Sequence, residues 1–170
     1  MMTRPIDTVV DWLRDAHAME QQSEKMTQGF SDRLKHYPQL KVRLEQHIEE
    51  THGQKELLKG CLDRLGANPS ILKDLTGKII AFGQSVSGIP VDDEVIKGAM
   101  SCYVFEHMEI ASYKILISAA KAIGDIETQR VCELILAQEV AMAEWLGENL
   151  DELTFNYLSR SGDTMKEAKR

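Results

Sequence analysis

The chain has 170 residues, of which 43% are hydrophobic and 28% charged, a composition typical of one soluble globular domain. Its net charge of -7 argues against nucleic-acid binding, because a basic patch is the usual footprint of that partner. No apolar run approaches the roughly 20 residues of a membrane span, and the N-terminus lacks the apolar core of a signal peptide. We therefore expect a cytoplasmic protein that contacts neither membrane nor nucleic acid.

The cysteines do not indicate a special site. Cys61, Cys102 and Cys132 are too few and too widely spaced for a disulfide framework or a cysteine-based zinc site. We interpret them as small buried hydrophobic residues.

Apolar residues recur with a helical period along the first part of the chain. The pattern predicts a helix over 6–37 that stops before Pro38. A second helix is predicted over 38–65, with Gly66 as its C-terminal cap. A short turn between the two makes them antiparallel neighbours.

The second half repeats this arrangement after a long connection. We predict a short helix over 68–84, a loop over 85–90, and long helices over 92–123 and 126–158. The tail over 159–170 is polar and is expected to fray.

Two helical hairpins joined by a long connection predict an all-α, four-helix bundle of the ferritin-like type. The crossover would carry the extra short helix, and residues 1–158 would form a single domain.

Carboxylates interrupt the apolar stripes of three predicted helices. On a helical wheel Glu20 lies within the stripe of the first helix, Glu106 and Glu109 within that of 92–123, and Glu139 within that of the last helix. No lysine or arginine of these helices falls on the same stripes nearby. A buried carboxylate must be paired, bound to metal or protonated, so the unpaired cluster favours metal cations.

The spacing of further candidate ligands supports this interpretation. Glu49 and His52 form Glu-x-x-His, whose members lie one turn apart, although His52 is at the margin of its stripe and Glu49 further round. Each such pattern is common on solvated helices, but their combination across four helices matches dinuclear carboxylate sites. Met142 stands where the second half would need the matching histidine.

Two side chains near the predicted metal site each have two possible roles. His17 either packs beside the site or, less often, binds metal directly. Tyr113 either donates a hydrogen bond to a ligand carboxylate or packs as a core aromatic. His47 and His107 are expected to point away from the apolar stripes.

Two segments, His47–Gln54 (HIEETHGQ) and Glu106–Tyr113 (EHMEIASY), resemble the YciE/YciF-type stress proteins of the ferritin-like superfamily. The resemblance implies a ferritin-like fold, a homodimer and a rubrerythrin-like dinuclear metal site. The ligands it implies are Glu20, Glu49, His52, Glu106, Glu109 and Glu139. Since the thioether of Met142 is a poor ligand for a hard ion, one metal position would be weaker, open, or completed by water or Glu109.

The leading hypothesis is a protein with two metal ions, iron or manganese with iron favoured, that reacts with oxygen or peroxide in stress defence. Both metals accept this ligand set, so the sequence alone does not separate them. The alternative is a helical interaction or dimerisation protein in which the metal is structural or lost. Iron storage would need a closed shell of subunits, which no sequence feature indicates. The sequence leaves open whether the protein is an enzyme.

Overall fold

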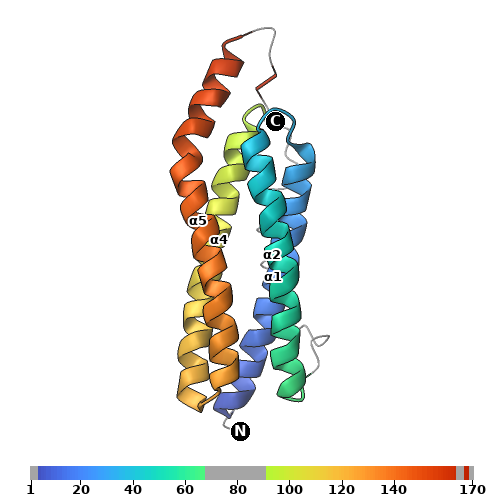
Figure 1. Ribbon diagram of the computed structural model, residues 1–170, viewed down its shortest axis with the longest axis vertical. Coiled ribbons are helices and arrows are strands. Elements are labelled where there is room, and N and C mark those ends of the chain that lie inside the picture. The colour runs from blue at the N-terminus through green and yellow to red at the C-terminus, as the bar shows by residue number, and fades with distance from the viewer. Residues whose placement is uncertain (1–3, 68–90, 164–166, 169–170) are drawn as a thin grey trace.

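Four long helices form an elongated bundle in the computed structural model, which describes residues 4–67, 91–163 and 167–168 (Figure 1). They are α1 (Pro5–Arg33), α2 (Pro38–Arg64), α4 (Glu94–Ile123) and α5 (Ile126–Ser161). Helix α1 packs against α2 and α4, and α5 packs against α4 and α2. Each hairpin therefore supplies two adjacent sides of the bundle, and all four helices face one central core.

Local sequence explains where the helices begin and end. Pro5 and Pro38 occupy the first turns of α1 and α2, where a missing backbone N–H costs nothing. Gly66 follows α2 with φ 68°, and Gly124 ends α4 with φ 74°, a left-handed conformation that favours glycine. Asp125 then caps α5 by accepting a hydrogen bond of 3.2 Å from the backbone N–H of Thr128.

Some predicted bounds need correction. The first helix ends at Arg33 rather than at residue 37, since Leu34 is already extended and the ring of Pro38 disfavours the α conformation at Tyr37. The last helix continues three residues beyond 158, to Ser161. The predicted crossover helix and the loop after it lie outside the described residues.

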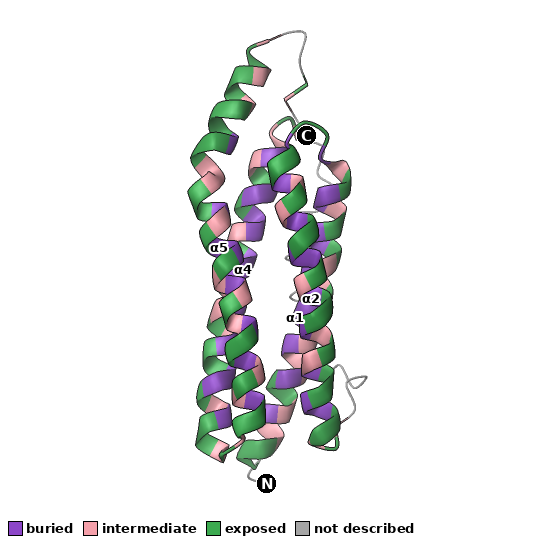
Figure 2. Cartoon of the chain, in the orientation of Figure 1, coloured by how far each residue is buried: buried purple, intermediate pink, exposed green. Residues whose placement is uncertain are grey.

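Buried residues occur along the length of all four helices (Figure 2). Most of them are aliphatic or aromatic, but buried glutamates, a histidine and a glutamine are among them. The three cysteines are buried and free, as predicted. Gly98 of α4 lies against Phe30 of α1, where an added Cβ would come within 2.3 Å of the ring. The described helices include none that combines the length and the apolar character needed to cross a membrane.

Candidate metal centre

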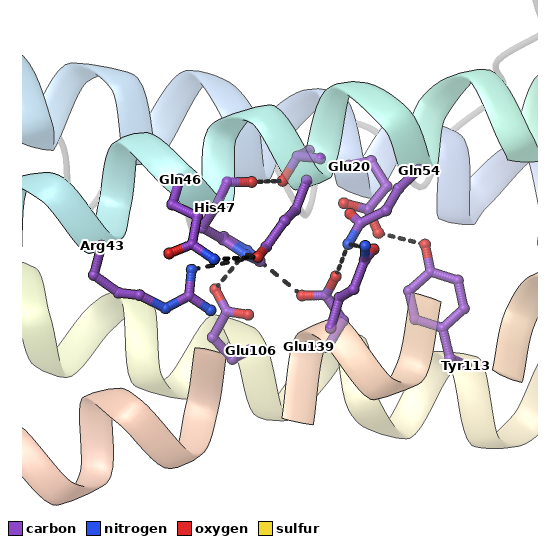
Figure 3. Close-up of polar contacts among 11 residues, drawn as sticks. Glu20, Arg43, Gln46, His47, Gln54, Glu106, Tyr113 and Glu139 are labelled. Carbon is purple, nitrogen blue, oxygen red and sulfur yellow. Dashed lines mark hydrogen bonds and ion pairs between the residues drawn. The ribbon is translucent and has the colours of Figure 1, made fainter. Parts of the chain in front are cut away.

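Four glutamates from three helices lie buried in the middle of the bundle. Glu20 comes from α1, Glu106 and Glu109 from α4, and Glu139 from α5, and none is more than 1% exposed. The prediction that these side chains face the interior is therefore confirmed. Figure 3 shows Glu20, Glu106 and Glu139 directed into the space between the helices.

Helix α2 contributes His47 to this cluster. The ring is 1% exposed, with Nε2 3.4 Å from Glu106 Oε1 and 3.6 Å from Glu139 Oε2. The expectation that His47 points away from the core was wrong. The apolar stripe of the leucines and Ile48 does not define the inner face of α2 through the polar stretch between Ile48 and Leu57.

Glu49 and His52, the ligands predicted on α2, lie elsewhere. The Glu49 side chain is 79% exposed and that of His52 is 47% exposed. His52 and Lys55 instead contact Glu24 of α1 near the surface. The structure does not bring Glu49 or His52 to the buried carboxylates, so their role as ligands has no support from the geometry.

The buried residues are close enough to share an ion. One potential ligand atom from each of His47, Glu106, Glu109 and Glu139 lies within 4.8 Å of the others. Glu20 is directed into the same space between the helices (Figure 3). Burial and the charge of Glu20 both raise the pKa of Glu109 and Glu139. Carboxylates with imidazole form a donor set that suits iron, manganese or zinc.

The carboxylates retain unused oxygens. Among the described residues, both oxygens of Glu109 and one oxygen each of Glu20, Glu106 and Glu139 are buried without a hydrogen-bond partner. Buried polar atoms are normally paired, because an unpaired one forfeits its hydration. The orphaned oxygens are hard donor atoms in a buried part of the bundle, so the cluster fits a metal ion.

Burial and the charges of neighbouring carboxylates raise the pKa of Glu20, Glu109 and Glu139 in the absence of a cation. Burial raises the pKa of Glu20 to about 7, although a hydrogen bond from Tyr113 opposes the rise. Burial and the charges of neighbouring carboxylates raise the pKa of Glu109 and Glu139 well above the ordinary value. Near neutral pH the metal-free cluster therefore holds protons, and a metal ion would compete with them.

His47 is the basic group that faces the cluster. Burial alone would lower its pKa, but the charge of Glu106 and contacts with Glu106 and Glu50 raise it to about 10. One imidazolium compensates part of the negative charge. No lysine or arginine within the described chain forms an ion pair with Glu20, Glu106, Glu109 or Glu139.

Neutral side chains hold two of the carboxylates in place. Tyr113 donates its hydroxyl hydrogen to Glu20, one of the two arrangements expected for it, and Gln54 of α2 donates to Glu139 (Figure 3). Met142 is fully buried. His17 lies instead at the α1–α2 seam, where burial and the charges of Lys55 and Lys59 lower its pKa.

Sequence reasoning missed the inner face of α2, although a signal for it exists. Three polar residues continue the leucine stripe at alternating steps of three and four residues, the period of one helix face. The face runs through Leu44, His47, Thr51, Gln54 and Leu58, all of which are buried.

Comparison with known proteins agrees with this architecture. Residues 4–159 match the family model described as "Domain of unknown function (DUF892)". A crystal structure of a protein from Xanthomonas campestris pv. campestris is 38% identical, covers 95% of this chain and 100% of its own, and has a TM-score of 0.81.

Two more distant structures support the fold alone. The stress protein YciF of E. coli is 20% identical over 88% of this chain and 96% of its own, with a TM-score of 0.76. Ferritin-like, diiron-carboxylate proteins from Bacillus anthracis are 18% identical over 88% of this chain and 99% of theirs, with a TM-score of 0.71. The chain therefore belongs to the DUF892 family, and it shares its four-helix fold with YciF and with the ferritin-like proteins.

Proposed function

We propose that this protein binds two metal ions, iron in preference to manganese, within the buried cluster. The observation that supports this most directly is the set of buried carboxylate oxygens near His47 that lack hydrogen-bond partners. The proposed ligands are Glu20, His47, Glu106, Glu109 and Glu139. The distant similarity to diiron-carboxylate proteins of the same fold suggests the number and kind of metal.

We further propose that the centre reacts with oxygen or peroxide during stress. A bound iron ion would supply the electrons for reducing the oxidant, and anionic ligands would stabilise its oxidised form. The chain would hold the carboxylates through Tyr113 and Gln54 and would exclude bulk water with its buried core. The E. coli relative is described as a stress protein, which agrees with such a role.

Metal analysis and a spectroscopic titration test this proposal. Protein from iron- or manganese-supplemented cultures, purified without chelator, should contain metal, and the iron form should change its absorption spectrum on adding peroxide. Glu109→Gln should lose most of the metal, whereas Glu49→Gln, at an exposed site, should retain it. A metal content near zero in the wild type after both supplements would reject the function.

Two observations favour the alternative of an interaction or dimerisation protein. The contacts of His47 with Glu106 and Glu139 offer partial compensation of charge without metal, and Met142 replaces a possible histidine ligand. A large rise in melting temperature on metal loading, without any reaction with peroxide, would support a structural metal. If adding metal changes neither the melting temperature nor the reaction with peroxide, the result would support loss of the metal.

We also propose a homodimer, as the family resemblance suggests. Helix α4 exposes the apolar side chains of Val104 and Ile115, and Trp12 of α1 is 40% exposed. Sedimentation of the purified protein tests this, and a monomer at all concentrations would contradict it.

A further inference from the structure

Glu50 lies next to Glu49 in sequence but has very different surroundings. The Glu50 side chain is 20% exposed, against 79% for Glu49. Its Oε2 atom lies 3.0 Å from Nδ1 of His47. Glu50 is therefore the carboxylate that contacts the outer side of the ring whose Nε2 atom faces Glu106 and Glu139.

Two further side chains hold Glu50. A guanidinium nitrogen of Arg43 lies 3.3 Å from the same Oε2 atom, and Gln46 donates a hydrogen bond of 3.0 Å to Oε1. Figure 3 shows Arg43 and Gln46 grouped beside His47. Both oxygens of Glu50 are thus engaged, and one of them remains directed at the imidazole ring.

This contact determines which ring nitrogen can bind an ion. An ionised carboxylate only accepts hydrogen bonds, so Nδ1 of His47 must carry the hydrogen that it donates to Glu50. With the proton held on Nδ1, the lone pair of a neutral ring lies on Nε2, which has no hydrogen-bond partner among the described residues. That nitrogen points toward the carboxylates.

We propose that Glu50 is a positioning residue that fixes the tautomer and orientation of His47 so that Nε2 serves as a metal ligand. The inference rests on the proposed metal-binding function and extends it to a residue outside the ligand set. Histidine ligands in metalloproteins commonly donate their other N–H to a carboxylate, which fixes the ring and increases its basicity. Glu50 supplies that carboxylate from the same helix, one turn away.

Calorimetric titration with Mn²⁺ measures the effect on affinity. Glu50→Ala should weaken Mn²⁺ binding about 10- to 100-fold, the usual cost of losing such a partner. Glu49→Ala is the matched control and should leave the affinity within about twofold of wild type, since this neighbour is exposed and does not contact His47. Glu50→Gln keeps an acceptor oxygen without the charge, so its Mn²⁺ affinity should lie between those of Glu50→Ala and Glu49→Ala. Equal affinities for Glu50→Ala and Glu49→Ala would overturn the proposal.

A double-mutant cycle shows whether Glu50 acts through His47. Once His47 is replaced by alanine, adding Glu50→Ala should change the Mn²⁺ affinity by less than about twofold. If Glu50→Ala costs as much in the His47→Ala background as in wild type, Glu50 does not position the ring.

NMR of the metal-free protein separates this inference from the proposed function. The Nδ1–H proton of His47 should give a hydrogen-bonded, downfield resonance in wild type and Glu49→Ala that disappears in Glu50→Ala. Persistence of that resonance in Glu50→Ala would overturn the positioning role. Failure of wild type to bind Mn²⁺ or iron while the resonance behaves as expected would instead refute the metal-binding function.

Discussion

The hydroxyl of Tyr113 on α4 donates a hydrogen bond to Glu20 on α1, and both side chains are completely buried. The bond joins two helices at the level of the cluster and stabilises the ionised form of Glu20. Because burial outweighs this effect, the pKa of Glu20 still rises to about 7. The pair therefore couples the stability of the bundle to the charge on the cluster.

Replacing Tyr113 should show how much its hydrogen bond to Glu20 contributes to the stability of the protein. Tyr113→Phe removes the donor and leaves a buried carboxylate oxygen unpaired, so the free energy of unfolding at pH 8 should fall by about 1–3 kcal/mol. Denaturant unfolding of the metal-free protein measures the change. Tyr157→Phe, at a partly buried position of α5, should cost less than about 0.5 kcal/mol. Equal effects of the two variants would contradict the role given to the hydrogen bond.

The stability of the metal-free protein should depend on pH through Glu20. Its pKa is raised from 4.5 to about 7 in the folded protein, so the folded state binds the proton more tightly than the unfolded chain. The stabilisation is complete below pH 4.5 and is lost as pH rises through 7. The loss should amount to about 3 kcal/mol.

The raised pKa values of Glu109 and Glu139 act in the same direction. Glu20→Gln cannot ionise and should show a shallower decline in unfolding free energy between pH 5 and pH 8. Unfolding measured by denaturant at several pH values tests this, and an unchanged slope in Glu20→Gln would assign the pH dependence to other groups.

Metal should stabilise the protein more at higher pH. Ligand carboxylates and His47 must lose their protons to bind an ion, and the protons are held tightly in the metal-free cluster. We expect the rise in melting temperature on adding Mn²⁺ to be larger at pH 8 than at pH 6, and removal by chelator to reverse it. A rise that is independent of pH would indicate binding at exposed carboxylates instead.

Close packing of α1 on α4 requires glycine at position 98. An added Cβ would meet the ring of Phe30 at 2.3 Å, and Phe30 is itself buried, so Gly98→Ala should destabilise the protein by about 1–3 kcal/mol. Gly53→Ala is the matched control in α2, where a Cβ meets nothing within 4 Å. This second change should stabilise the protein by about 0.5–1 kcal/mol, since alanine favours helix. Thermal unfolding should therefore show a lower melting temperature for Gly98→Ala and a higher one for Gly53→Ala.

The carboxylates of the site could be predicted from the sequence on three helices but not on the fourth. Glu106, Glu109 and Glu139 have apolar residues one turn away on both sides, and Glu20 follows an apolar stripe that ends at Ala16, so the period defines the inner face of these helices. Helix α2 has polar residues on most positions at this level, and apolar periodicity has no information where the core itself is polar.

The lack of apolar periodicity on α2 also explains why the sequence predicts Glu49 and His52 as ligands. Glu-x-x-His at Glu49 and His52 is a recognisable motif, whereas His47 is distinguished from it only by its register relative to Leu44 and Leu58. Each residue turns the direction of the side chain by about 100° around the helix axis. An error of one residue in the assigned inner face therefore changes which histidine is expected to be buried.

The central claim is tested most directly by anomalous diffraction from crystals of the protein grown with iron or manganese. We predict anomalous peaks within the buried cluster, beside His47, Glu106, Glu109 and Glu139. The absence of any peak there, or a peak at Glu49 and His52 on the surface of α2, would contradict it.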